Sequence, residues 1–203
     1  MGLKDLKINF IADSAFELFI SKSIFDVTIK DIAEKAEVGE ATIYRYFGKK
    51  QNIVLHIVMK LQNEVKEKYF NLDAGKTGFD KLSIFFNSYL NIFKEKISYF
   101  GFIREFDAYM AEGDNSKSLA QYEEAVDSFN NIFEQAYQLG LQDGSVKEVD
   151  NISLFYYSST HALLELCKKL SVNHGLLNQD NTIEKSLEIE YLIGIFLKML
   201  KNS

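Results

Sequence analysis

The chain has 203 residues, of which 47% are apolar and 26% charged, a balance typical of a folded globular protein rather than of a disordered one. It lacks proline and has only 11 glycines, which favours long helices over short strands joined by turns. No run of about 18 apolar residues is present, so no membrane span is expected. The one cysteine, Cys167, has no disulfide partner within the chain, which favours a cytoplasmic location.

The formal net charge is −6, and its distribution along the chain bears on whether nucleic acid is a partner. Residues 1–50 carry eight basic and eight acidic side chains, so the whole acidic excess lies in residues 51–203. Because affinity for DNA depends on local contacts to phosphates, an acidic chain does not exclude DNA binding. The neutral first segment is nevertheless a weak electrostatic footprint, which counts mildly against tight binding of DNA.

Apolar side chains recur at helical spacing in the first third of the chain. Thr28 and Asp31 form a capping-box pattern where the second helix is expected to begin. The expected elements are a helix over 4–22, a short helix over 28–35, a turn at 37–39, a short helix over 40–47, and a long helix from 49 or 50 to about 70.

Glycine and polar clusters divide the rest of the chain into five more segments of helical length. Loops are expected at 71–79, 112–117, 140–150 and 173–181, and helices at 79–96, 98–111, 117–139, 151–172 and 182–201. The sequence therefore predicts an all-α fold of about nine helices. We expect an N-terminal three-helix helix-turn-helix domain over 1–50, a connecting helix over 49–70, and a larger helical bundle over 51–203.

The second and third helices, with the tight turn between them, meet the physical requirements of a helix-turn-helix. Ala33 is small enough for two helices to cross closely, Val38 places an apolar side chain in the turn, and Gly39 tolerates unusual backbone angles. Ile43 and Phe47 are four residues apart and share the inward face of the third helix. Donors suited to base edges and phosphates then lie on or beside the outward face: Thr42, Arg45 and Tyr46.

Residues 28–50, TIKDIAEKAEVGEATIYRYFGKK, resemble the signature of the TetR family of regulators. The matching positions are Thr28, Ile32, Ala33, Ala36, Val38, Thr42, Ile43, Tyr44, Tyr46, Phe47 and Lys50. The resemblance implies a ligand-responsive, DNA-binding transcriptional regulator, and in particular a repressor released from a palindromic operator by a small molecule. It implies no enzymatic activity and no cofactor, and the sequence itself has no nucleophile motif or metal-binding cluster.

The same resemblance assigns roles to individual positions. Thr28 and Lys30 would touch phosphate and a base, Ala41, Thr42 and Arg45 would face the major groove of double-stranded DNA, and Tyr44, Tyr46 and Lys50 would grip phosphates. The chain departs from the family pattern at Glu37 and Ala41, where glycine is usual, and at Gly39, where serine is common.

Glu40 adds an acid near the groove, where it either accepts a hydrogen bond from cytosine N4 or caps the helix. The acids at 37 and 40 keep an alternative open, a helical small-molecule-binding or interaction protein with weak or lost DNA binding.

Aromatic side chains are concentrated after residue 69, among 17 Phe and 11 Tyr in the whole chain. Most of them are expected to pack in the core, but a mostly apolar pocket between bundle helices is the functional alternative. The candidate pocket residues are Phe86, Tyr89, Phe93, Phe106, Tyr109, Tyr122, Phe129, Phe133, Phe155 and Tyr156. The resemblance favours a small effector in this pocket, and the aromatic lining favours an apolar or amphipathic one.

A homodimer is expected because one recognition helix reads only a few base pairs, and two heads reach adjacent major grooves when about 34–36 Å apart. The last two predicted helices have more apolar side chains than one buried stripe needs, which favours a four-helix interface. The candidate interface residues are Leu163, Leu166, Leu170, Tyr191 and Ile195. Effector binding would then change the spacing of the two heads through the long fourth helix.

Overall fold

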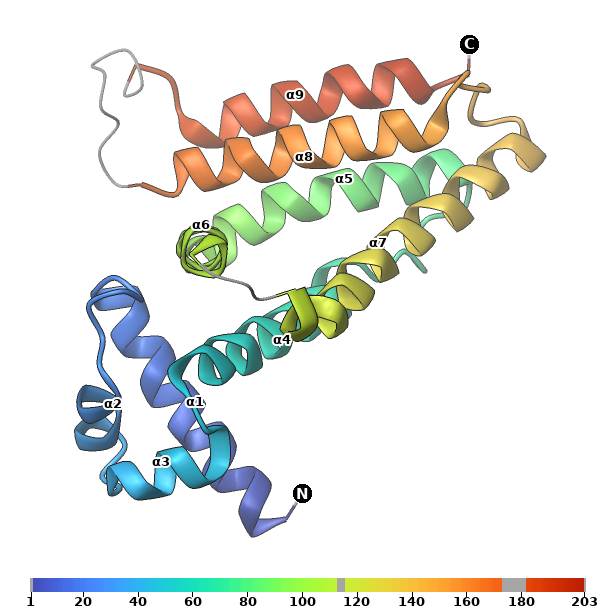
Figure 1. Cartoon of the computed structure of the whole chain (residues 1–203). Helices are drawn as coiled ribbons and strands as arrows, with labels where there is room; N and C mark the ends of the chain where they lie inside the picture. The colour runs from blue at the N-terminus through green and yellow to red at the C-terminus, as the bar shows by residue number, and fades with distance from the viewer. Residues whose placement is uncertain (1, 113–115, 173–181, 203) are drawn as a thin grey trace. The chain divides into compact units, whose positions relative to one another are not determined.

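The computed structural model describes residues 2–112, 116–172 and 182–202. Over these residues the chain forms nine helices, and its one β-type contact is an isolated antiparallel bridge between Val146 and Lys201 (Figure 1). The helices are α1 (Leu3–Ser21), α2 (Ile29–Lys35), α3 (Glu40–Phe47), α4 (Lys50–Tyr69), α5 (Gly78–Glu95), α6 (Ile97–Ala111), α7 (Ser116–Asp143), α8 (Ile152–Leu170) and α9 (Lys185–Leu200). The all-α prediction is confirmed.

The helices begin and end within a few residues of their predicted limits, and the largest difference is at the end of α7. The predicted loop over 173–181 lies outside the described residues, as do residues 113–115 of the predicted loop over 112–117. Within the described ranges, no helix has both the length and the apolar character that a membrane span requires.

The chain divides into two compact units. The head unit consists of residues 1–62 and 102–123, and the bundle unit consists of residues 63–101 and 124–203. Helices α4, α6 and α7 each contribute residues to both units. The head unit is therefore larger than the domain expected over 1–50, because periodicity identifies a helix without identifying the elements against which each part of it packs.

The head unit is built around α1, α2 and α3, whose inward apolar side chains are shielded from solvent. Ile11, Ile32 and Ile43 have no exposed surface. The predicted capping box is present: the Thr28 hydroxyl accepts the Asp31 backbone N–H at 3.1 Å, and the Asp31 carboxylate accepts the Thr28 backbone N–H at 2.8 Å. This second bond holds the pKa of Asp31 below its ordinary value, and it fixes the residue at which α2 begins.

In the bundle unit, α5, α8 and α9 lie side by side (Figure 1). Their core is aromatic, since Phe85 and Phe86 from α5 pack against Phe133 from α7 with ring centroids 5.4 and 6.0 Å apart, and Tyr156 from α8 lies 5.1 Å from Phe133. Edge-to-face and tilted arrangements predominate, as expected for rings that fill a core at close-packed density.

Helix α7 continues to Asp143 through Gly140, where a loop is predicted, and Gly140 lies against a second glycine at the beginning of α5. A Cβ atom on Gly78, in the first turn of α5, would lie 2.0 Å from the Gly140 backbone nitrogen. A Cβ atom on Gly140 would lie 2.4 Å from a methyl carbon of Val146. The pair therefore allows α5 and α7 to approach closely, and Gly140 does not end its helix.

Candidate functional site

The turn between α2 and α3 has one residue in the left-handed region, and it is Glu37, with φ 50°. Gly39 is the N-cap of α3 and has an extended backbone, φ −73° and ψ 147°, which any residue adopts. The expectation that Gly39 supplies the unusual angles of this turn is therefore wrong. The turn is closed by the Val38 backbone N–H, which donates to the Ala33 carbonyl at 3.0 Å.

Helix α3 presents one apolar and one polar side. Ile43 and Phe47 are buried, as predicted from their spacing. The sequence-predicted groove residues Ala41 and Arg45 are exposed, and Thr42 is half-buried. Free access of these side chains is what a recognition helix requires, because base edges are read by groups that project from it.

Two tyrosines flank this exposed side of α3. Tyr44 is exposed and Tyr46 is half-buried. The Arg45 guanidinium lies 5.0 Å from the centre of the Tyr46 ring and donates to its hydroxyl at 3.5 Å. This stacking restricts the arginine side chain at the surface, and so it lowers the conformational entropy that a contact to DNA would cost.

The beginning of α2 provides the second group of predicted DNA contacts. Thr28 is exposed, and its hydroxyl donates a hydrogen bond to the Asp31 carboxylate at 2.7 Å. The Lys30 ammonium lies 3.9 Å from the Glu34 carboxylate, with both side chains largely exposed. An exposed pair at this distance is weak, so Lys30 can leave Glu34 for a phosphate at little cost.

Lys50 differs from its predicted role. Its ammonium group is directed into the head unit, where it donates to the Ile24 carbonyl at 2.8 Å and the Val27 carbonyl at 2.9 Å. The neighbouring Lys49, which sequence reasoning did not single out, is exposed. The positive charge that the structure presents at the beginning of α4 is therefore that of Lys49, one residue before the predicted position.

The ten predicted pocket residues fall into two groups rather than one. Phe106, Tyr109 and Tyr122 belong to the head unit, and the other seven belong to the bundle unit. Phe106 and Tyr122 contact each other with ring centroids 5.0 Å apart, and burial raises the pKa of Tyr122 to about 12. The residues around Phe106 and Tyr109 in the sequence gave no signal that this half of α6 packs with the head unit.

The remaining predicted pocket residues lie in the bundle unit: Phe86, Tyr89, Phe93, Phe129, Phe133, Phe155 and Tyr156. Tyr89 is the unusual member, because it keeps some accessible surface although burial raises the pKa of its hydroxyl well above its usual value of 10. Tyr156, Tyr99 and Cys167 are near enough to raise that pKa further. Tyr89 therefore brings a hydroxyl into the aromatic interior of the bundle unit.

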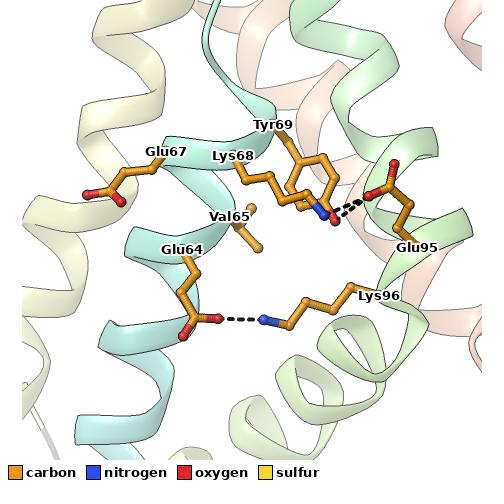
Figure 2. Close-up of a pocket in the computed structure, with 7 residues that line it drawn as sticks. All are labelled: Glu64, Val65, Glu67, Lys68, Tyr69, Glu95 and Lys96. Carbon is orange, nitrogen blue, oxygen red and sulfur yellow. Dashed lines mark hydrogen bonds and ion pairs between the residues drawn. The ribbon is translucent and has the colours of Figure 1, made fainter.

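A hollow of about 470 Å³ on the bundle unit has a different lining (Figure 2). Lys68 meets Glu95 at 2.7 Å and Lys96 meets Glu64 at 2.6 Å across it, and the Tyr69 hydroxyl donates to Glu95 at 3.1 Å. Because five of its seven lining residues, Glu67 among them, carry charged side chains, this hollow differs from the aromatic lining predicted for an effector.

The α8 and α9 helices leave large apolar side chains exposed, as expected for a surface that another chain covers. Tyr191 is 76% and Ile195 44% exposed. Leu163 and Leu170 are buried inside the bundle unit and Leu166 is half-buried, so the assignment of Leu163 and Leu170 to an interface is corrected: they fill the core of their own chain. Leu154 and Leu187, which the sequence pattern also places among the apolar residues of these two helices, are exposed, and so are Tyr157 and Met199, which sequence reasoning did not select.

Comparison with known sequences gives a family match to the N-terminal part of the chain, which belongs to the head unit. Residues 11–57 match the family model for bacterial regulatory proteins of the tetR family. A stretch of 44 residues is 50% identical to the uncharacterized HTH-type transcriptional regulator YvkB of Bacillus subtilis. That match covers 22% of this chain and 23% of the relative, so it spans less than a quarter of the relative's length.

Comparison with solved structures covers nearly the whole chain. A bacterial regulatory protein of the tetR family from Rhodococcus RHA1 is 14% identical, with a TM-score of 0.71, over 97% of this chain and 98% of that one. The fatty acid degradation regulator FadR of Bacillus halodurans is 15% identical, with a TM-score of 0.70, over 97% and 96%. The regulator FadR of Bacillus subtilis, in complex with stearoyl-CoA, is 15% identical, with a TM-score of 0.69, over 94% and 97%. These likenesses show a shared fold.

Proposed function

We propose that the chain, whose residues 11–57 match the family model for bacterial regulatory proteins of the tetR family, is a repressor of that family, released from a palindromic operator by a small effector. The observation that carries the proposal is the two-sided α3 helix, whose apolar side is anchored in the head while Ala41, Tyr44 and Arg45 are exposed. Helix α3 lies in the major groove of double-stranded DNA, with Ala41, Thr42 and Arg45 toward the bases. Tyr44, Tyr46, Thr28 and Lys30 position it on phosphates.

The effector is an apolar or amphipathic molecule held among the aromatic side chains of the bundle unit. Two facts support this class: the rings of Phe86, Phe133 and Phe155 pack together in an aromatic core, and a structural neighbour was solved with stearoyl-CoA. The Tyr89 hydroxyl orients the polar end of the ligand, because a buried hydroxyl gains from any partner that replaces water.

The protein acts as a homodimer through the exposed face of α8 and α9. Support comes from the apolar side chains left in solvent there: Leu154, Tyr157, Leu187, Tyr191, Ile195 and Met199. Two heads on one dimer read two half-sites, which doubles the base contacts of a single short helix. The effector favours the dimer arrangement whose head spacing does not fit the groove repeat, and it does so only by the difference in its affinity for the two arrangements.

DNA binding is tested by selecting genomic fragments with the purified chain and then measuring affinity for the selected fragment at several salt concentrations. The double variant Tyr44→Ala/Arg45→Ala should bind at least tenfold more weakly while keeping its circular dichroism and melting temperature. Wild-type affinity that does not change with salt would instead support an interaction protein that has lost DNA binding through Glu37 and Glu40.

Effector class is tested by a melting-temperature screen that contains fatty acids, acyl-CoA esters, lipophilic cations and polar metabolites. Amphipathic compounds should raise the melting temperature in proportion to the logarithm of their concentration. They should also weaken operator binding, and Tyr89→Phe, which removes only the hydroxyl, should lessen both effects. Shifts produced by polar metabolites alone would contradict the proposed class, and tight binding without loss of operator affinity would contradict the release mechanism.

A further inference from the structure

Three carbonyl groups of the loop between α1 and α2 converge on the ammonium group of Lys50. The Ile24 and Val27 carbonyls accept at 2.8 and 2.9 Å, and the Phe25 carbonyl lies at 3.4 Å. A lysine has three N–H donors, so this set of acceptors occupies the group completely. Burial lowers the pKa of Lys50, and the nearby Asp26 carboxylate partly opposes this shift because it raises the pKa. A lysine engaged in this way has no donor left for a phosphate.

Helix α6 covers the same lysine and holds the same loop. The Tyr109 ring centre lies 5.2 Å from the Lys50 ammonium, a distance at which a cation is attracted to an aromatic face. The Phe25 ring meets Tyr109 edge to face at 5.4 Å. The Ser23 hydroxyl donates to the Glu105 carboxylate at 2.7 Å. The loop is thus fastened to α4 by Lys50 and to α6 by Ser23 and Phe25.

The loop leads directly into the DNA-binding surface. The Val27 carbonyl that Lys50 holds belongs to the peptide unit that joins Val27 to Thr28, and this unit is planar. Fixing that carbonyl therefore fixes the orientation of the Thr28 backbone N–H, which donates to Asp31 in the capping box of α2. The Lys50 side chain is in this way connected, through one peptide unit, to the residue at which α2 begins.

We propose that Lys50 is a positioning residue, which sets α2 and Thr28 for phosphate contact through the α1–α2 loop, and that Tyr109 links this setting to α6. The proposal rests on the proposed DNA-binding function. It assigns the phosphate contact at the beginning of α4 to the exposed Lys49 instead. Because α6 is one helix from Ile97 to Ala111, a displacement of α6 alters the hold on the loop.

The test compares Lys50→Met with Lys49→Met, a matched loss of one positive charge at the neighbouring exposed position. Methionine keeps most of the length of the lysine side chain and removes the ammonium donors. Operator affinity is measured against salt concentration for both variants, for Tyr109→Leu, for Thr28→Ala and for the combination of Lys50→Met with Thr28→Ala. Circular dichroism and melting temperature are recorded for every variant.

Lys50→Met should weaken operator binding about tenfold without changing the slope of log affinity against log salt, because no phosphate contact is lost. Tyr109→Leu should weaken it in the same sense. The double variant Lys50→Met/Thr28→Ala should lose less operator affinity, on a free-energy scale, than the sum of the losses in the two single variants, since both substitutions act on the phosphate contact of Thr28. A slope that falls by about 0.9 in Lys50→Met, together with additive losses, would overturn the proposal.

The melting temperatures separate this proposal from the proposed function. Wild-type protein without salt-dependent affinity for bulk DNA would refute the DNA-binding function. In that case a lower melting temperature for Lys50→Met than for Lys49→Met still supports the lysine's hold on the loop, and equal melting temperatures overturn it.

Discussion

At the scale of single residues, the turn between α2 and α3 places Glu37 in the left-handed backbone region, which side chains with a Cβ atom disfavour. Glycine has no such penalty, although it loses more conformational freedom on folding. Glu37→Gly is therefore expected to increase the free energy of unfolding by about 0.5–1 kcal/mol in urea denaturation. The exposed Glu37 side chain has no ion-pair or hydrogen-bond partner among the described residues whose loss would oppose this gain.

The control for this prediction is Glu124→Gly, the same substitution at an exposed position inside α7. Glycine in a helix interior lowers stability by about 1 kcal/mol, so this variant should unfold more easily than wild type. If both substitutions destabilised the chain equally, the strain assigned to Glu37 would be absent.

His56 gives the head unit a dependence on pH. Burial lowers the pKa of its ring below 6.5, the nearby Lys60 lowers it further, and Asp13 opposes both. Nε2 lies 3.3 Å from the side-chain oxygen of Asn9. The unfolded chain binds the proton on His56 more readily than the folded chain does. The contribution of neutral His56 to the free energy of unfolding is therefore fully present above pH 6.5, and it is lost as the pH falls from that value toward the folded-state pKa.

The expected result is a melting temperature that decreases between pH 7 and pH 5, with a smaller decrease in His56→Gln. Glutamine cannot titrate in this range, so it removes the contribution of this ring and leaves those of the carboxylates. An identical pH profile for the two proteins would show that His56 does not contribute.

At the scale of secondary-structure elements, the contact of α5 with α7 depends on two glycines facing each other. The Asp143 carboxylate also accepts the Gly78 backbone N–H at 2.8 Å, which ties the end of α7 to the beginning of α5. Gly78→Ala places a methyl group against the Gly140 backbone and should lower the free energy of unfolding by about 1–3 kcal/mol. Chemical denaturation of the variant and of wild type measures this difference.

Gly101→Ala is the matched control, because a Cβ atom at Gly101, inside α6, has no neighbouring atom within 4 Å. Alanine is a better helix former than glycine, so this variant should gain about 0.5–1 kcal/mol. Opposite signs for the two substitutions identify close approach as the reason for Gly78; equal signs would refute it.

At the scale of the whole molecule, the proposed dimer depends on the exposed face of α8 and α9. Tyr191→Glu places a charge on a side chain that is 76% exposed in the single chain, so it should leave the fold of one chain intact. Burying an unpaired charge at an interface is costly, so sedimentation at micromolar concentration should show a shift from dimer to monomer. Leu6→Glu, at an exposed apolar position on α1, is the control, and it should leave the proportion of dimer in sedimentation unchanged. A monomeric wild-type protein would refute the dimer itself.

The sequence predicts the elements of this chain well because their signals are local. The capping box of Thr28 and Asp31 fixes the beginning of α2, and the four-residue spacing of Ile43 and Phe47 fixes the inward face of α3. The exposed Arg45 and Tyr44 follow from the same period. A helix can be identified in this way because its hydrogen bonds join residues four apart, whatever surrounds it.

Assignments that required knowledge of distant partners were the ones that changed. The family resemblance predicts that Lys50 contacts a phosphate, yet its ammonium group donates to backbone carbonyls more than twenty residues away in the sequence. Tyr109 was placed with the bundle aromatics but packs in the head unit, and Leu163 fills a core instead of an interface.

The sequence by itself determined the nine-helix pattern, the helix-turn-helix and the side of α3 that is exposed, because these depend on periods and caps within a few residues. Only the tertiary structure decided which half of α6 belongs to the head unit and where the Lys50 ammonium group is directed. It alone also showed that Gly140 allows α5 and α7 to approach closely. Those depend on contacts between segments that the chain brings together when it folds, and no local pattern records such contacts.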